Sequence, residues 1–252
     1  MLGLQHYPFF RLLILLDKLI KYQMKKIKHP LVNGVVKEIV PRIYCVIVDD
    51  DYDRAMLFCR YQEFYESPYK KFRGKPFTWM EYMRHYKDAW KKDVFTYPED
   101  WSGYNIPSNV MQKANHIFCK DTEYDEIMND IYFYCAIDSQ NKNEGTRCDW
   151  YLIGASSKDK GTMNHEIAHG LYYTNKVYKK MVDILIDNIK PIHYDKLKKK
   201  LIKMGYVDDK KIIDDEIQAF MSTGLYNGLD TKELKVYEKE FKNNFKKFNN
   251  VS

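Results

Sequence analysis

The sequence lacks several features that would assign a function directly. Its five cysteines are odd in number and include no Cys-x-x-Cys pair, which disfavours a disulfide framework and a cysteine-based zinc site. Only seven of the 41 cationic side chains are arginine, the residue that makes bidentate contacts to phosphate and guanine. No glycine-rich phosphate-binding loop is present. These absences predict a cytoplasmic, reducing environment and disfavour nucleic acid as a partner.

The sequence also lacks a hydrophobic run that would span a bilayer. The apolar stretch at residues 8–20 is interrupted by three charged residues and is shorter than the roughly 20 residues that a span requires. We expect an amphipathic helix that packs on the protein body, although its lysine-rich flank could also hold it at a membrane surface. Because no linker-like stretch occurs, we expect an N-terminal helical extension over residues 1–40 and one main domain over residues 41–252.

Hydrophobic patterning predicts an α+β fold. Short apolar runs rich in β-branched and aromatic residues predict strands at residues 42–48, 131–137 and 150–155. The polar segment 138–149 between the last two is typical of a hairpin, so we expect a small, mostly antiparallel sheet. The turn-rich segment 95–107 is expected to be a loop.

Helical spacing of apolar residues predicts a largely helical C-terminal half. In the C-terminal half, helices are predicted at residues 162–174, 176–190, 194–204, 210–222 and 231–248. Earlier in the chain, helices are predicted at residues 53–66, 78–90 and 108–118. In the last of these, aromatic residues recur at intervals of three and four, and lysines fill the opposite face. We interpret that aromatic stripe as part of the core.

One motif in the helical half points to a chemical function. Residues 165–169 read His-Glu-Ile-Ala-His, which is an HExxH sequence. On a helix the two histidines lie about one turn apart on the same face, so both imidazoles can bind one metal ion. Glu166 can then reach a water on that ion. Because a catalytic zinc takes three protein ligands and leaves one position for water, the motif needs a third ligand elsewhere in the chain.

The third ligand is expected among three consecutive acidic residues, Asp214, Asp215 and Glu216. Glu216 falls within the apolar face of its predicted helix, where a charge is costly unless it is paired with a cation. Asp214 and Asp215 are better suited to a solvated first turn, where negative charge complements the helix dipole. We therefore expect Glu216 to bind the metal together with His165 and His169.

The HEIAH motif, followed by an Asp-Glu-x-x-Ala-Phe helix, resembles the gluzincin metallopeptidases. The pattern of Glu216 with Ala219 and Phe220 is most similar to that of the lethal-factor-type toxins and the repressor-cleaving bacterial gluzincins. The resemblance covers residues 150–225. It implies a zincin-like fold, a Zn²⁺ cofactor held by His165, His169 and Glu216, and hydrolysis of a peptide or protein substrate with Glu166 as general base. The metzincin branch is excluded because no third histidine follows in an HExxHxxGxxH pattern.

Two details of such an enzyme follow from the resemblance. The strand predicted at residues 150–155 resembles the edge strand along which these enzymes align an extended substrate. The resemblance does not identify the group that stabilises the oxyanion, and Tyr206, Tyr226 and His193 are all candidates.

Other functions compatible with the sequence are kept as alternatives. The Asp49–Asp53 cluster follows a predicted strand and could hold Mg²⁺ or Mn²⁺ for phosphoryl or glycosyl transfer. The chain could also be a catalytically inactive metal-binding protein, or a basic interaction protein that recruits acidic partners through lysine-rich segments such as residues 194–203. In the plainest alternative, the two histidines only pack or form hydrogen bonds.

Overall fold

A five-stranded mixed sheet forms the centre of the molecule in the computed structural model, which describes residues 27–29, 31–48, 50–118, 120–145, 148–225, 229 and 232–249. The strands are β1 (Ile27–Lys28), β2 (Asn33–Val40), β3 (Ile43–Val48), β4 (Gly103–Pro107) and β5 (Tyr151–Ala155). Their spatial order is β1-β2-β3-β5-β4, and every neighbouring pair is antiparallel except β3 and β5. The predicted α+β class with a mostly antiparallel sheet is therefore confirmed.

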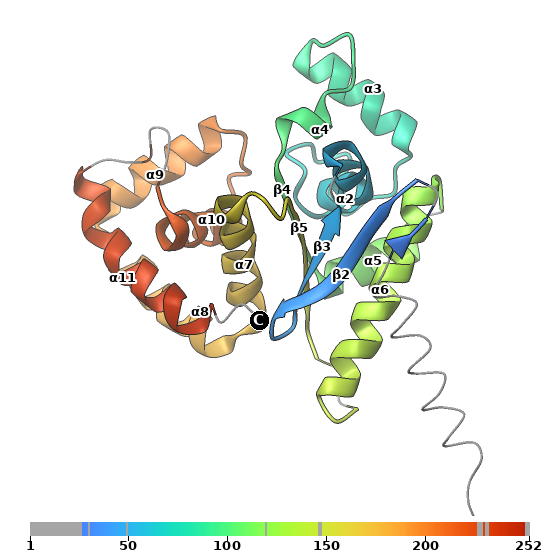
Figure 1. Cartoon of the computed structure of the whole chain (residues 1–252). Coiled ribbons are helices and arrows are strands. Elements are labelled where there is room, and N and C mark those ends of the chain that lie inside the picture. Colours follow the sequence, from blue (N-terminus) through green and yellow to red (C-terminus); the bar gives the residue numbers. More distant parts are fainter. Residues whose placement is uncertain are drawn as a thin grey trace, which may run out of the picture.

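Helices lie on both sides of this sheet (Figure 1). One group comprises α2 (Asp51–Glu66), α3 (Trp79–Trp90), α4 (Tyr97–Asp100), α5 (Ser108–Ile117) and α6 (Glu123–Lys142). The other comprises α7 (Lys160–Thr174), α8 (Lys176–Asp187), α9 (Pro191–Lys203), α10 (Lys210–Thr223) and α11 (Lys232–Phe248). The helical C-terminal half is thus as predicted, and α7 is the helix of this half that packs on β4 and β5.

Alternate residues of the central strands point into two separate cores. Tyr44 and Val46 of β3 belong to the core that includes α2 and α6, whereas Ile43 and Cys45 belong to the core formed with α7–α11. Side chains alternate across a sheet, and here both faces are covered, so both sets of residues are apolar. This arrangement explains why the strand at residues 42–48 reads as a continuous apolar run.

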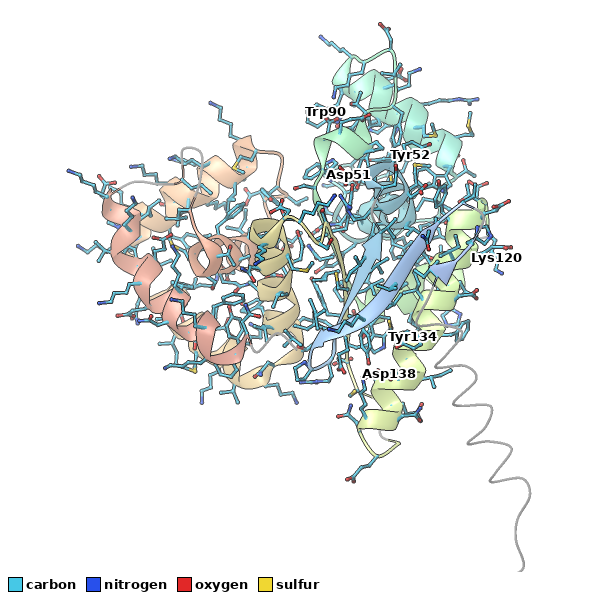
Figure 2. The ribbon with its side chains drawn as sticks, viewed as in Figure 1. Asp51, Tyr52, Trp90, Lys120, Tyr134 and Asp138 are labelled. Atoms are coloured by element: carbon cyan, nitrogen blue, oxygen red, sulfur yellow. The ribbon has the colours of Figure 1, made fainter. Side chains whose placement is uncertain are left out.

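The strand predicted at residues 131–137 is wrong, because these residues lie within α6. Ile131, Tyr134 and Asp138 are buried at helical spacing, while Phe133 on the opposite face is 52% exposed. Figure 2 shows Tyr134 and Asp138 on this helix, and the Tyr44 hydroxyl of β3 donates to Asp138 at 2.8 Å. The β-branched and aromatic composition therefore reflects packing of a helix on the sheet. The hairpin predicted for residues 138–149 is wrong for the same reason.

The segment 95–107 is not a loop throughout, because it contains α4 and the edge strand β4. β4 pairs with β5 in the register Asn105↔Ile153. Strand β5, which we expected at the edge, consequently lies between β3 and β4. β4 contains glycine, asparagine and proline, which are uncommon in strands, so its sequence does not predict an extended conformation. Proline is tolerated here because β4 lies at the edge of the sheet.

The N-terminal boundary also differs from the prediction. Residues 33–40, which we assigned to a helical extension, form β2 and pair with β3. The amphipathic helix expected earlier in the chain lies outside the described residues. None of the helices in the described part of the chain is both long and apolar enough to cross a membrane. The four cysteines within it are all free.

Candidate metal centre

The HExxH motif lies in the middle of α7, which crosses one face of the sheet. The helix begins after Asp159, whose side chain accepts a hydrogen bond from the backbone N–H of Thr162. Gly170, directly after the motif, allows a close approach to the sheet, because a Cβ at this position would lie 2.8 Å from Cδ1 of Ile43. The motif is consequently held in the core, and His169 is only 2% exposed.

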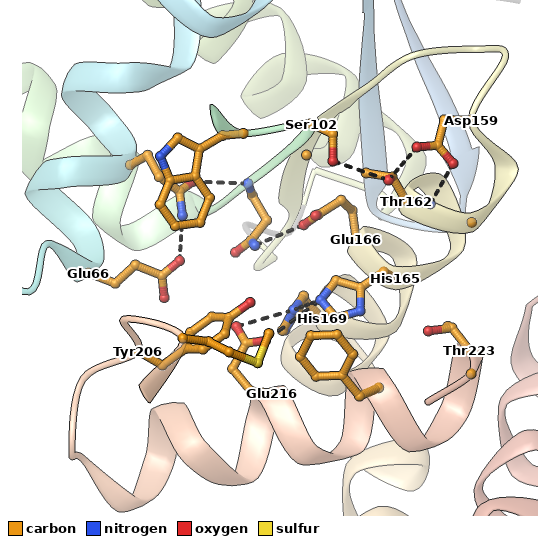
Figure 3. Close-up of a pocket in the computed structure, with 18 of the residues that line it drawn as sticks. Glu66, Ser102, Asp159, Thr162, His165, Glu166, His169, Tyr206, Glu216 and Thr223 are labelled. Carbon is orange, nitrogen blue, oxygen red and sulfur yellow. Dashed lines mark hydrogen bonds and ion pairs between the residues drawn. The ribbon is translucent and has the colours of Figure 1, made fainter. Parts of the chain in front are cut away.

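Three predicted side chains from α7 and α10 converge on one point (Figure 3). The Nε2 atoms of His165 and His169 are 3.2 Å apart. A carboxylate oxygen of Glu216 lies 3.6 Å from each of these nitrogens, Oε2 from His165 and Oε1 from His169. In the described part of the chain, this is the only group of three or more His, Cys, Asp or Glu side chains close enough to hold a metal ion.

The spacing and burial of these atoms fit a metal ion. Tetrahedral bonds of about 2.0–2.1 Å place ligand atoms roughly 3.3 Å apart, which matches the distances between the two imidazoles and the carboxylate. Oε2 of Glu216 is buried, and within the described residues no hydrogen bond of 3.5 Å or less reaches it; Nε2 of His165 lies 3.6 Å away. A buried carboxylate oxygen without a partner is costly, and a cation at this point would satisfy it. The residues therefore fit a divalent ion that accepts nitrogen and oxygen ligands.

Asp215 holds one of the histidines in position. Its Oδ1 atom lies 2.8 Å from Nδ1 of His169, and the amide of Gln218 donates to the same oxygen at 3.0 Å. The expectation that Asp215 belongs to a solvated helix turn is wrong, because α10 turns this carboxylate toward α7. A hydrogen bond at Nδ1 fixes the orientation of the His169 ring and leaves Nε2, which faces the cluster, as the atom that could bind a metal ion.

The imidazoles and carboxylates of the cluster shift one another's pKa values. Burial acts to lower the pKa of His169, but the carboxylates of Asp215 and Glu216 outweigh it and raise that pKa well above its ordinary value. Burial acts to raise the pKa of Glu216, but His169, together with hydrogen bonds from His165 and Tyr206, holds it below its ordinary value. The carboxylates and imidazoles of the cluster therefore favour one another's charged forms.

Glu166 faces the cavity beside the cluster and is fixed by the edge strand. The side-chain amide of Asn105 donates to its Oε2 at 2.9 Å, and the Tyr151 hydroxyl donates to Oδ1 of Asn105 at 2.7 Å. The tyrosine thereby fixes which end of the asparagine amide faces Glu166. A Cβ at Gly103 would collide with the other carboxylate oxygen, Oε1. Burial raises the pKa of Glu166, and the nearby histidines oppose this effect.

A cavity of about 680 Å³ opens beside the cluster. Its walls come from α2, from the segment that leads into β4 and from β4 itself, from α7, from the segment between α9 and α10, and from α10 and the residues that follow it. The cavity is lined by His165, Glu166, His169 and Glu216, and also by Trp101, Tyr206 and Phe220. The metal-ligand cluster and Glu166 are therefore reachable by a molecule larger than water.

The structure separates the remaining candidates for oxyanion stabilisation. Tyr206 lines the cavity and forms a hydrogen bond with Glu216. His193 lies elsewhere, with its Nδ1 atom 3.0 Å from the hydroxyl of Tyr237. Tyr226 lies outside the described residues. Among the described candidates, only Tyr206 is near the cluster.

The described residues of the Asp49–Asp53 cluster have structural partners. Asp50 caps α2 by accepting a hydrogen bond from the backbone of Asp53. Asp51 pairs with Arg54, and Asp53 accepts a hydrogen bond from the Tyr124 hydroxyl at 2.8 Å. These carboxylates do not form a metal-binding group with one another.

Sequence reasoning missed Asn105, Gln62 and Glu66, which face Glu166 or the cavity from β4 and α2. No local motif marks them, because their positions depend on strand pairing and helix packing. Comparisons of this chain with family models, with curated proteins and with solved structures found no match.

Proposed function

We propose that this protein is a zinc-dependent peptidase of the gluzincin type, with His165, His169 and Glu216 as the zinc ligands and Glu166 as the general base. The observation that supports it most directly is the convergence of the three ligand atoms beside a cavity, with Glu166 on the wall of the same cavity. A helix whose histidines merely pack would not explain why two imidazole Nε2 atoms and the buried carboxylate of Glu216 converge on one point.

Glu166 and Tyr206 have separate tasks in this proposal. A bound zinc ion supplies a Lewis acid that polarises the scissile carbonyl and lowers the pKa of the attacking water. Glu166 accepts the proton of that water and returns it to the leaving amide nitrogen, while Asn105 holds its carboxylate. The hydroxyl of Tyr206 forms a hydrogen bond with Glu216 in this structure; once zinc binds Glu216, it can instead donate a hydrogen bond to the oxygen on which negative charge develops.

The edge strand β4 provides a surface for a peptide substrate. Among the described strands it pairs only with β5; on its other side the N–H of Asn105 already donates to Gln62, and the backbone at Gly103, which lines the cavity, is where main-chain hydrogen bonds to an extended chain would form. Because β4 also contacts Glu166 through Asn105, a peptide added to this edge would pass the general base. This role replaces the one we expected for residues 150–155.

Metal content and turnover test the proposal together. Wild type purified without added metal should contain one zinc per chain, and His165→Ala and Glu216→Ala should lose it. His193→Ala is the matched control, because His193 contacts Tyr237 and not the cluster, and it should retain zinc.

Glu166→Gln separates binding from chemistry. It should keep its zinc and cleave a peptide library about 10²–10⁴-fold more slowly than wild type, the usual contribution of a general base. Zinc binding without hydrolysis in wild type would favour an inactive metal-binding protein. Equal hydrolysis by wild type and Glu166→Gln would overturn the assignment of the base.

A further inference from the structure

The cavity beside the metal-ligand cluster is acidic, although the chain as a whole carries a net charge of +6. Of the 20 described residues that line it, five are Asp or Glu and none is Lys or Arg. The five are Glu66, Asp100, Asp159, Glu166 and Glu216. Such a lining favours cationic ligands over anionic ones, but its significance depends on whether each carboxylate already has a partner.

Four of these five carboxylates have partners that explain their presence. Glu216 belongs to the ligand cluster, and Glu166 accepts the amide of Asn105. Asp100 pairs with Lys92 at 2.8 Å and also accepts hydrogen bonds from Tyr86 and Thr96, and Asp159 caps α7 through Thr162. None of these four is left without a role in the metal site or in the fold.

Glu66 is the exception. It is the last residue of α2, is half-buried, and accepts a hydrogen bond from the amide of Gln62. Within the described residues, no cationic side chain forms an ion pair with it. Burial raises the pKa of Glu66 well above its ordinary value; the carboxylate of Glu216 adds to this effect, and His169 opposes it in part. A cation delivered into the cavity would stabilise the charged form of this side chain.

The position of Glu66 is fixed relative to the edge strand. Gln62, one turn earlier on α2, accepts the backbone N–H of Asn105 in β4 at 3.1 Å and donates its amide to Glu66. The same Asn105 holds Glu166 through its side chain. Figure 3 shows Glu66 on the opposite side of the site from Asp159 and Thr162, with Glu166 between them and the ligand cluster below. A peptide lying along β4 beside Glu166 therefore comes within reach of Glu66.

We infer that Glu66 binds a cationic group of the substrate, so that the proposed peptidase selects peptides with a lysine or arginine side chain, or a free N-terminal amine, near the scissile bond. The inference rests on the proposed function. Trp101 and Tyr206 line the same cavity and provide aromatic faces that also favour cations. The lysine or arginine side chain and the free N-terminal amine are both positively charged N–H donors.

A binding experiment tests this inference without requiring turnover. The zinc-loaded Glu166→Gln protein is incubated with a random decapeptide library, in one arm N-acetylated and in the other with free N-termini, and the retained peptides are sequenced by mass spectrometry. The best-retained sequence is then resynthesised with norleucine in place of lysine and glutamine in place of arginine, and the affinities are compared. The same comparison is made in Glu66→Gln/Glu166→Gln, and zinc content is measured in both proteins.

Cationic peptides should bind about 10- to 100-fold more tightly than their neutral counterparts, because hydrogen bonds to charged groups contribute that much to affinity. Glu66→Gln keeps the size of the side chain and should abolish this preference without weakening binding of the neutral peptides. Asp159→Asn is the matched control, since asparagine caps a helix equally well, and it should keep the preference. Loss of the preference in the acetylated arm would assign the cation to the terminal amine, and its persistence would assign it to a side chain.

Failure of the proposed peptidase function and failure of the proposed role of Glu66 give different results. If no peptide is retained and wild type cleaves none, the proposed function fails. If peptides are retained and cleaved without preference for a cation, or if the preference survives Glu66→Gln, the role of Glu66 is overturned while the peptidase assignment stands.

Discussion

The hydrogen bond that Asp215 accepts from His169 allows a test of the candidate metal centre with two variants of graded severity. His169 is almost completely buried, and its Nδ1 atom lies 2.8 Å from Asp215. Asp215→Asn keeps an oxygen at this position but removes its charge, whereas Asp215→Ala removes both. Because partners of ligating histidines typically contribute 10- to 100-fold to metal affinity, we expect zinc to bind about tenfold more weakly in Asp215→Asn. In Asp215→Ala we expect a loss of about a hundredfold, close to 2.7 kcal/mol.

Competition with a chromophoric chelator at fixed pH measures these affinities. Asp214→Asn is the matched control, because Asp214 accepts a hydrogen bond from Tyr194 at 2.7 Å and does not contact a histidine. Its affinity for zinc should equal that of wild type. The reasoning is refuted if Asp215→Ala also binds zinc as tightly as wild type.

The pH dependence of the same measurement follows from the raised pKa of His169. In the metal-free protein this imidazole keeps its proton above its ordinary pKa, so zinc must displace that proton to bind. Affinity should therefore rise with pH through the neutral range and level off above the raised pKa. Asp215→Asn removes a charge that raises the pKa of His169, so the affinity of this variant should level off at a lower pH.

Three further predictions concern the scaffold. Asp125→Ala should cost about 3–5 kcal/mol in urea unfolding, because it leaves the buried Arg60 without its ion-pair partner at 2.5 Å. Gly154→Ala should cost about 1–3 kcal/mol in the same assay, because its Cβ would lie 2.5 Å from the ring of Phe58. Burial raises the pKa of Glu63, so wild type should lose stability as the pH rises above 4.5 through that raised pKa, and thermal melts of Glu63→Gln should show a weaker loss.

Controls at exposed sites calibrate these values. Glu126→Ala removes an exposed ion pair with Lys120 at 3.7 Å and should change stability by less than about 0.5 kcal/mol. Gly161→Ala adds a Cβ near only the flexible carboxylate of Asp159, and it should be tolerated. If the buried and exposed substitutions have equal effects, the packing argument fails.

Local sequence patterns predicted the helices and strands in which apolar residues follow a regular pattern. The helices α8–α11 were recognisable because one face of each is regularly apolar, the strand at residues 42–48 because it is a continuous apolar run, and the helix of His165 and His169 because of the HExxH spacing. Burial of Glu216 in an apolar face likewise distinguished it from its acidic neighbours. These features depend on residues close together in the sequence.

Features that depend on distant pairing were missed. Residues 131–137 have strand-like composition, but α6 places them on a helix that packs against β3. Conversely, β4 contains glycine, asparagine and proline and is extended because β5 pairs with it. The role of Asp215 could not be read from its helix alone, since it depends on how α10 packs on α7.

The missed strand β4 is also the one that joins the two sides of the candidate site. Asn105 contacts Glu166 through its side chain and Gln62 through its backbone, and Gln62 contacts Glu66. The proposed general base and the proposed cation-binding residue are therefore positioned by one edge strand rather than by the motif helix. A displacement of β4 would disturb both residues while leaving His165, His169 and Glu216 together, so metal binding and substrate selection should be separable by mutation.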